Sequence, residues 1–275
     1  MSYTKNRNTS PFPRQRIFKA LRAATGRSYD CYLSQPFERA ITNRIDRIGD
    51  DFDAYLKLLE RDTDEARALE REALVGLTTF FRDPEAFQAL RQQIVPQLLE
   101  DREDNRTLRI WVPGCSTGQE AFSLGILLAE LQRETDRPFS FRIAGTDINH
   151  EALRYAQRGR YHRHHVRQLS SELCERYLPI DGDQHRVCTG LRNNTLFFIH
   201  DVLTPPPLGQ LDLISCRNLL IFLRTSFQRR VLTSFAESLK GGGLLFVGAS
   251  ENTHDGPDCL TLIDMQHRIF QCSKE

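Results

Sequence analysis

Apolar residues follow two different periods along the chain. Over about residues 14–99 they recur at intervals typical of helices, and strand patterns are scarce. From residue 108 onward, short apolar runs alternate with helix-like stretches, and the all-polar stretch EDREDNRT, residues 100–107, separates the two patterns. The sequence therefore predicts an all-α N-terminal domain over residues 1–99 and a second domain over residues 100–275.

The short apolar runs of the second domain predict strands. They occupy residues 108–112, 141–147, 195–201, 211–217, 243–249 and 267–272. A helix is expected at about residues 119–131, and Asn149 can cap another helix after the second strand. Alternation of strands and helices is typical of a parallel, doubly wound α/β sheet.

Polar residues follow four of these strands, at the end where doubly wound sheets bind ligands. Gly114 and Gly118 follow the first strand and would let the backbone turn tightly and approach a ligand. Asp147 ends the second strand, where a carboxylate can accept both hydroxyls of a ribose. His200-Asp201 and Cys216-Arg217-Asn218 end two more strands. This pattern favours a nucleoside pocket.

The loop after the first strand, PGCSTGQE, discriminates between nucleoside cofactors. A dinucleotide site needs G-x-G-x-x-G, so that a pyrophosphate can lie at the helix N-terminus. That spacing is absent here, and Glu120 would repel a phosphate. A carboxylate at this position suits a cationic ligand instead. S-adenosylmethionine has adenosine, ammonium and sulfonium groups and no phosphate, so we expect it rather than a nicotinamide cofactor.

Composition and charge change this interpretation little. The net charge of +1 gives no reason to expect nucleic acid as a partner, and no apolar run approaches the roughly 18 residues of a membrane span. Seven scattered cysteines without a C-x-x-C pair, and no secretory signal, favour reduced thiols in a cytoplasm. Residues 161–169, YHRHHVRQL, lack a Cys or Asp at zinc-site spacing, so they favour a solvated basic turn over a metal site.

Five segments, in order, resemble the chemotaxis receptor methyltransferases of the CheR type. They are LTTFFRDPEAF (77–87), WVPGCSTGQEAFSLGILLAE (111–130), AGTDINHEALRYAQRGRY (144–161), DLISCRNLLIFL (212–223) and LKGGGLLFVGASEN (239–252). The resemblance runs from roughly residue 15 to the end of the sequence. It implies a helical domain before a Rossmann-like methyltransferase domain. It also implies methyl transfer from S-adenosylmethionine to glutamates of chemoreceptors, with S-adenosylhomocysteine as product.

The same resemblance implies roles for individual residues. Glu120 and Asp147 would hold the methionine and ribose parts of the cofactor. The further residues expected to bind the cofactor are Thr78, Arg82, Gly114, Asp201, Val202, Arg217 and Asn218. Arg82 is also the expected catalytic residue. The acceptor carboxylate is already ionised at neutral pH and needs no general base, so alignment is what the protein must supply, and a guanidinium grips a carboxylate at two points.

Features of the family also imply how the partner binds. Residues 177–198 fit the small antiparallel insertion of the family. The turn IDGDQH in it is shorter than in members that dock on a tethering peptide at the receptor tail, which favours recognition of the cytoplasmic receptor domain without a tether. In the first domain, Arg39, Arg44 and Arg47 lie on a possible helix of the kind that meets acidic methylation helices, although neighbouring acids dilute its charge.

Three residues depart from the family pattern. Gly76 stands for the asparagine before L-T-x-F-F-R, Gln119 for the first acid of an E-E pair, and Phe222 for the tyrosine of the CRNxxIYF segment. Loss of the phenol would remove a positioning hydrogen bond and leave the chemistry intact. Methyl transfer is therefore the favoured function, and a cofactor-binding regulatory or interaction module with little turnover is the alternative.

Overall fold

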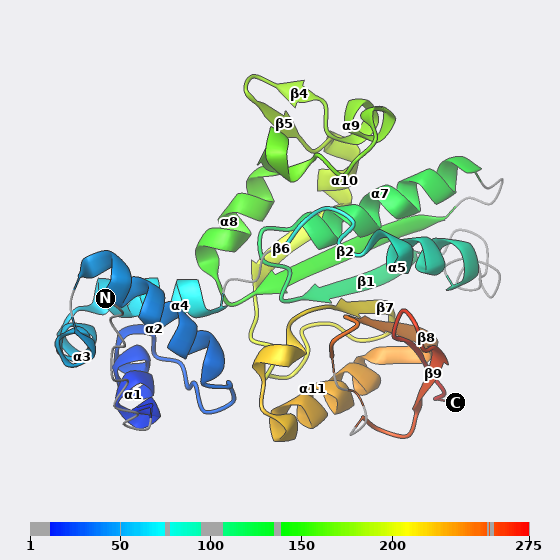
Figure 1. The fold of residues 1–275 in the computed structure, drawn as a ribbon. Helices are drawn as coiled ribbons and strands as arrows, with labels where there is room; N and C mark the ends of the chain where they lie inside the picture. Colours follow the sequence, from blue (N-terminus) through cyan, green and yellow to red (C-terminus); the bar gives the residue numbers. More distant parts are fainter. Residues whose placement is uncertain are drawn as a thin grey trace, which may run out of the picture. The chain divides into compact units, whose positions relative to one another are not determined.

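The computed structural model describes residues 12–49, 51–74, 78–94, 107–134, 139–251, 253 and 256–274 of the chain (Figure 1). Contacts divide the chain into two compact units. The helical unit comprises Met1–Val75 with Phe222–Arg224, and the sheet unit comprises Gly76–Ile221 with Thr225–Glu275. Within the described ranges, every helix is too short or too polar to cross a bilayer.

The described residues of the helical unit form four helices, in agreement with the predicted all-α region. They are α1 (Arg14–Thr25), α2 (Gln35–Ile48), α3 (Phe52–Arg61) and α4 (Thr63–Leu74). Gly26 and Gly49 end the first two helices in the left-handed conformation, which glycine adopts without strain. The Asp51 side chain begins α3 by accepting a hydrogen bond of 2.8 Å from the Ala54 amide. The core of the unit includes Ile17, Leu21, Phe37, Tyr55, Leu59 and Leu69, all at most 2 % exposed.

A short segment from much later in the chain completes the helical unit. Leu223 is 1 % exposed and forms an isolated antiparallel bridge with Tyr32. The Leu33 amide donates to the Phe222 carbonyl at 2.9 Å, and the Arg224 amide donates to the Cys31 carbonyl at 2.8 Å. The unit is therefore discontinuous in sequence.

A seven-stranded sheet forms the centre of the sheet unit. Its strands are β1 (Thr107–Pro113), β2 (Ser140–Asp147), β6 (Thr195–Ile199), β7 (Leu211–Cys216), β8 (Leu239–Val247), β9 (Leu260–Asp264) and β10 (Ile269–Cys272). The order is β6-β2-β1-β7-β8-β10-β9, and neighbouring strands from β6 to β8 are parallel. The strand β10 runs antiparallel to both β8 and β9, so the sheet is mixed rather than fully parallel.

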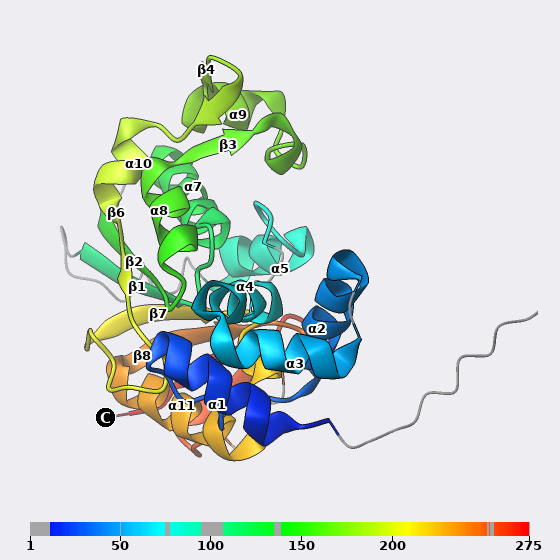
Figure 2. The ribbon, with the colours of Figure 1, turned by 90° about the vertical axis from the view of Figure 1, so that its left-hand side faces the viewer.

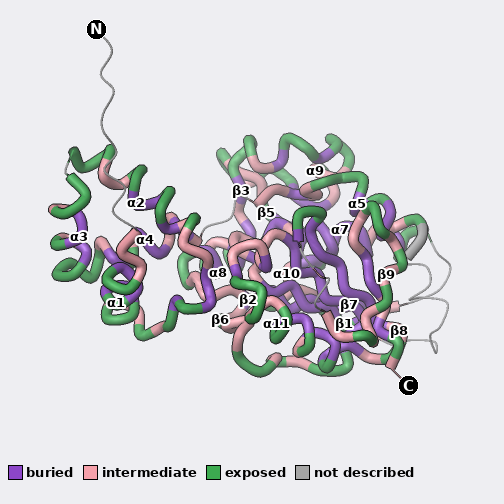
Figure 3. The backbone as a smooth tube through the Cα atoms, turned by 60° about the horizontal axis from the view of Figure 1, so that its bottom comes forward, coloured by how far each residue is buried: buried purple, intermediate pink, exposed green. Residues whose placement is uncertain are grey.

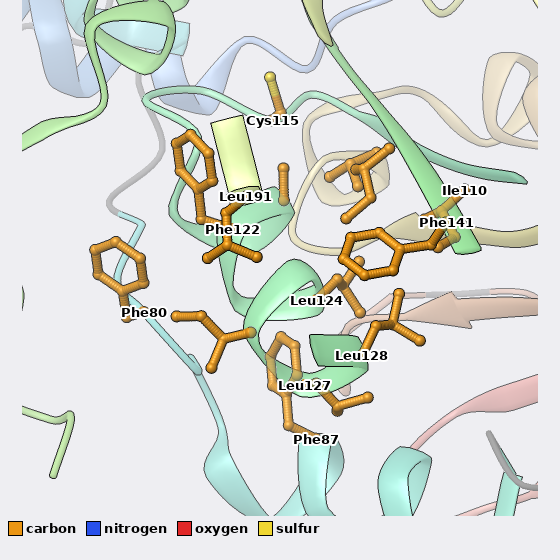
Figure 4. Close-up of a cluster of buried hydrophobic side chains, with 14 of the residues drawn as sticks. Phe80, Phe87, Ile110, Cys115, Phe122, Leu124, Leu127, Leu128, Phe141 and Leu191 are labelled. Carbon is orange, nitrogen blue, oxygen red and sulfur yellow. The ribbon is translucent and has the colours of Figure 1, made fainter. Parts of the chain in front are cut away.

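Helices cover both faces of this sheet, as a doubly wound fold requires (Figures 1 and 3). They are α5 (Pro84–Ala89) with η1 (Leu90–Ile94), α7 (Gln119–Glu134), α8 (His150–Arg158), α10 (Thr189–Asn194) and α11 (Thr225–Ser238). The helix α7 supplies Phe122 and Leu124 to a large apolar cluster with Ile110 and Phe141 of the sheet (Figure 4). On the opposite face, Phe235 of α11 packs against Trp111, with ring centroids 5.4 Å apart.

The boundary between the units differs from the predicted one at residues 99 and 100. The helix α5 belongs to the sheet unit, because Phe87 packs on Phe246 of β8 with ring centroids 5.8 Å apart. Helical periodicity places this segment with the preceding helices, but periodicity identifies only the element and not the core on which it packs.

A small antiparallel sheet stands apart from the main one, at the top of Figure 2. It contains β3 (Arg160–His162), β4 (Ile180–Asp181) and β5 (Gln184–Arg186) in the order β3-β5-β4, with η2 (Arg163–His165) and α9 (Ser171–Tyr177) between the first two strands. The insertion predicted at residues 177–198 is therefore present but begins earlier. Its expected last part forms α10 and β6 of the main layers instead.

Candidate functional site

The strand order of the main sheet reverses at β1, which lies between β2 and β7. In parallel sheets the carboxyl ends of such strands flank a crevice in which ligands bind. The loops that begin with Gly114, Asp147 and Arg217 all leave the sheet at this edge.

Asp147 joins two of these loops. One carboxylate oxygen accepts a 2.8 Å hydrogen bond from the Ser116 amide, and the other accepts a 2.8 Å bond from the Asn149 amide. Gly114 has φ +68°, and a Cβ atom there would lie 2.9 Å from the Leu219 side chain. Only a glycine therefore fits this turn without strain or repacking. The two hydrogen bonds from Ser116 and Asn149 fix the position of the Asp147 carboxylate.

Glu120 lies in the first turn of α7, where its carboxylate is largely withdrawn from solvent. Its Oε1 accepts a 2.7 Å hydrogen bond from the Ser215 hydroxyl of β7, and its Oε2 lies 4.0 Å from Nη1 of Arg217. Burial raises the pKa of Glu120 to about 7, although Arg217 and Ser215 favour the ionised form. A cation placed beside this carboxylate would favour its ionised form further.

The Arg217 guanidinium is buried and bound by other residues of the chain, so it acts as an internal clamp and is not open to a ligand. Its side chain is 1 % exposed, Nη1 donates to the Arg82 carbonyl at 2.8 Å, and Nη2 donates to Asp83 Oδ2 at 2.6 Å. It lies over two aromatic rings, 5.2 Å from the centroid of Phe87 and 4.7 Å from that of Phe246. The guanidinium thereby fastens the segment before α5 to the end of β7, which explains how a cation is accommodated in this core.

The next residue, Asn218, adopts φ +60°, and its buried Oδ1 has no hydrogen-bond partner within the described part of the chain. The loop around it is held by Glu251, which is 2 % exposed. This carboxylate accepts hydrogen bonds from the amides of Leu219 at 2.9 Å, Leu220 at 2.8 Å and Gly248. A rigid loop thus presents an amide oxygen that a ligand donor could satisfy.

The remaining predicted residues lie in two segments. Thr78 and Arg82, both half-buried, precede α5, and the Phe81 amide anchors their segment by donating to the Ser123 hydroxyl of α7 at 2.9 Å. Asp201 and Val202, also half-buried, follow β6. Asp201 Oδ1 accepts a 2.9 Å hydrogen bond from the Leu203 amide. The end of β6 reaches Asp147, because the His200 amide donates to the Asp147 carbonyl at 3.2 Å.

Three residues of this region had no predicted role. Ser215 orients Glu120, Asp83 pairs with Arg217, and Glu251 organises the loop after β7. All three stand within family-like segments, and Ser215 also lies near the end of β7. The pairing of Asp83 with Arg217 gives no signal in the sequence, because the two residues lie 134 positions apart.

The three departures from the family pattern have different surroundings. Gln119 is 1 % exposed, and its Oε1 accepts a 2.6 Å hydrogen bond from the Thr117 hydroxyl, so it stabilises the loop before α7. Phe222 is part of the helical unit, through its carbonyl bond to Leu33. Gly76 lies outside the described residues.

The sheet order, the antiparallel last strands and the helices on both faces define a Rossmann-like methyltransferase fold. The family model described as CheR methyltransferase, SAM binding domain, matches residues 76–269, and the chain belongs to this family. The resemblance found in the sequence is thereby confirmed.

Curated relatives agree with this membership. A chemotaxis protein methyltransferase of Listeria monocytogenes is 32 % identical over 203 residues, which cover 73 % of this chain and 74 % of that protein. The probable biofilm formation methyltransferase WspC of Pseudomonas putida is 31 % identical over 243 residues, with coverage of 87 % and 56 %. An uncharacterized 104.1 kDa protein of Rhodobacter capsulatus is 32 % identical over 241 residues. The match covers 87 % of this chain but only 25 % of that protein.

Proposed function

We propose that the chain is a protein-glutamate O-methyltransferase that uses S-adenosylmethionine and releases S-adenosylhomocysteine. Its acceptors would be glutamate side chains of chemoreceptors or related signalling proteins. The observation that carries the proposal is the mostly buried Glu120 carboxylate at the reversal point of a CheR-family sheet. A buried acid at that place suits a cofactor that carries an ammonium group.

The groups around this point fit S-adenosylmethionine. Asp147 would accept the ribose hydroxyls, and Glu120 would hold the ammonium group. Asn218 Oδ1, which is buried and unpartnered among the described residues, offers an acceptor to a further donor of the ligand. The other expected contacts are those of Thr78, Arg82, Gly114, Asp201 and Val202. Arg217 would act on the cofactor site through Glu120 and through the backbone of Arg82.

Methyl transfer requires little of the protein beyond alignment of the acceptor carboxylate with the methyl group of the cofactor. When bound, the cofactor supplies an electrophilic methyl group on a sulfonium sulfur. The acceptor glutamate has an ordinary pKa near 4.3, so it is an anion at neutral pH and no residue has to remove its proton. Arg82 would hold that carboxylate at two points, and Arg217 fixes the backbone from which Arg82 projects.

We further propose that the partner is the cytoplasmic domain of a membrane chemoreceptor, recognised without a C-terminal tether. The hairpin of the insertion supports this idea. Only Gly182 and Asp183 separate β4 from β5, and Gly182 has φ +70° as a tight turn requires. Such a short turn leaves little loop with which to grip a second peptide.

A second candidate function is a cofactor-binding regulatory module with little turnover. Phe222, which replaces a tyrosine usual in the family, is the observation that favours it. An assay separates the two candidates: purified chain, S-adenosylmethionine labelled in the methyl group, and a receptor fragment. We expect base-labile methyl esters on the fragment. Cofactor binding without ester formation would favour the second candidate, and absence of cofactor binding would contradict both.

A further inference from the structure

The basic residues of α2 are already engaged within the helical unit. Arg44 donates to both carboxylate oxygens of Glu65, at 2.5 and 2.6 Å, and lies 3.3 Å from Glu72. Arg47 also pairs with Glu72. Two of the three arginines that the sequence suggests for an acidic partner are therefore neutralised by acids of α4.

These pairs would be costly to exchange for a partner. The side chains of Arg44 and Glu65 are 17 % and 12 % exposed, and Tyr55 donates a further hydrogen bond of 2.9 Å to Glu65. Removing Arg44 from this network would leave a mostly buried carboxylate without its main counter-charge. An acidic partner consequently gains little from α2.

The sheet unit carries the opposite arrangement. Residues 154–167 contain five arginines, three histidines and no acid. Arg160 pairs with Asp181 at 2.7 Å, whereas the other four arginines are exposed and have no ion pair with any residue in the described ranges. We name the exposed arginines and histidines of this segment the basic strip: Arg154, Arg158, Arg163, Arg167, His162 and His164.

A well-packed backbone carries the basic strip. The segment runs from α8 through β3 and η2 without a break, and Figure 2 shows α8 leading into the small sheet. Leu153, Ala156 and Val166, which are at most 5 % exposed, fix its inner side. Arg154 and Arg158 lie four residues apart on α8, so both guanidinium groups leave the same face of the helix.

We propose that the basic strip is the docking surface for an acidic helical face of the methyl-accepting partner. The inference rests on the proposed function, since a glutamate-methylating enzyme acts on a segment rich in carboxylates. Glutamates four residues apart on a partner helix match the spacing of Arg154 and Arg158, and each guanidinium can bind a carboxylate at two points. Because the chain as a whole has a net charge of only +1, attraction of an acidic partner depends on such a local surface.

A pair of charge-matched variants of the full chain tests the proposal. In the strip variant, glutamine replaces Arg154, Arg158, Arg163 and Arg167. In the control variant, glutamine replaces four exposed arginines elsewhere: Arg22, Arg61, Arg229 and Arg230. The probe is a fluorescent, glutamate-rich helical fragment from the methylation region of a chemoreceptor. Its affinity is measured by anisotropy at low and high salt, and S-adenosylhomocysteine affinity is measured by calorimetry.

We expect the strip variant to bind the fragment at least about fivefold more weakly, with a reduced salt dependence. The control variant should change less than about twofold, and both should keep wild-type affinity for S-adenosylhomocysteine. A version of the fragment with glutamine in place of glutamate should bind all three proteins equally weakly. Retained cofactor affinity shows that the strip variant is folded.

Other outcomes overturn the proposal. Equal losses in both variants would mean that only overall charge matters. Unchanged binding by the strip variant, or no binding by the wild type, would place the partner elsewhere. Strip-dependent binding to phosphatidylserine vesicles or to single-stranded RNA, with none to the fragment, would assign the surface to a different class of partner. Fragment binding that depends on the strip without any methyl transfer would retain this inference and remove the proposed function.

Discussion

Glu120 shows how one residue can combine structural burial with ligand recognition. Its carboxyl group lies mostly buried beside Ser215 and Arg217, and desolvation raises its pKa to about 7, far above the value in an unfolded chain. The folded protein therefore binds this proton more tightly than the unfolded chain does. The contribution of Glu120 to the free energy of unfolding therefore falls as pH rises from about 4.5 through 7.

Cofactor binding should show the opposite pH dependence. An ammonium group favours ionised Glu120, so affinity for S-adenosylhomocysteine should rise roughly tenfold between about pH 6 and pH 8. Calorimetry at the two pH values measures this rise. The Glu120→Gln variant, which cannot ionise, should bind weakly and with a flat pH profile. A wild-type affinity that does not change with pH would remove Glu120 from the ammonium site.

Asp147 permits a second test at the level of one side chain. Asp147→Ala should weaken S-adenosylhomocysteine by about 1.5–3 kcal/mol, because charge-assisted bonds to the ribose are lost and the Ser116 and Asn149 amides lose their acceptor. Asp147→Asn retains the shape and one acceptor oxygen and should weaken binding less. Calorimetry compares the three proteins. Equal affinity of the alanine variant and the wild type would place Asp147 outside the cofactor site.

Arg82 should matter more for turnover than for cofactor affinity. Lysine cannot reproduce the two-point grip of a guanidinium on a carboxylate, so Arg82→Lys should slow methylation of a receptor fragment several-fold. The clamp formed by Arg217 should survive, because it holds the carbonyl of Arg82 and not its side chain. Single-turnover rates and S-adenosylhomocysteine affinities provide the comparison. Equal losses in both would make Arg82 chiefly a cofactor ligand.

At the scale of elements, Glu251 connects the loops that follow β7 and β8. The amides of Leu219, Leu220 and Gly248 donate to its buried carboxylate, so Glu251→Ala leaves them without an acceptor. We expect a loss of about 2–4 kcal/mol in the free energy of unfolding, measured by urea denaturation. The exposed Glu237 on α11 is the matched control, and Glu237→Ala should change that free energy by less than about 0.5 kcal/mol. A similar small change at Glu251 would contradict this structural role.

The elements were predictable where the local pattern was strong. The parallel strands are predictable because most residues of β1, β2 and β7 are buried and apolar, although Arg109, Arg142 and Asp212 interrupt the apolar runs. The prediction lacks β9, whose residues are half-buried or exposed at the edge of the sheet. The three-residue strand β3, which is mostly polar, gave no apolar run at all.

The contacts within the site were less predictable than its position. The polar groups that follow the predicted strands indicate Glu120, Asp147 and Arg217 as candidate ligand-binding residues. The partners of Arg217 could not be foreseen, because Arg82 and Asp83 reach it only after folding has brought distant segments together. Periodicity and strand order place a residue at an edge, but they do not determine which carbonyl its side chain meets.

In the molecule as a whole, the single tryptophan allows unfolding of the sheet unit to be measured separately from that of the helical unit. Trp111 is the single tryptophan, is 1 % exposed, and donates a 2.9 Å hydrogen bond to the Thr146 hydroxyl in the sheet unit. Its fluorescence should therefore follow unfolding of the sheet unit, whereas far-ultraviolet circular dichroism follows both units.

Ligand should stabilise the transition that the tryptophan reports. S-adenosylhomocysteine at about a hundred times its dissociation constant adds about 2.7 kcal/mol, which should raise the fluorescence midpoint by about 5–10 °C. The Asp147→Ala variant at the same ligand concentration should show a smaller rise. A midpoint that the ligand leaves unchanged would mean that it does not bind the sheet unit.

The discontinuity of the helical unit has a consequence for biosynthesis. Phe222–Arg224 belong to this unit, yet a ribosome adds them only after residues 76–221. The hydrogen bonds that Cys31 and Leu33 make to this segment cannot form while the nascent chain is shorter. The helices α1 to α4 would thus leave the exit tunnel well before the segment that completes their unit. Chaperones that bind nascent chains would therefore meet these helices with the site for Leu223 still open.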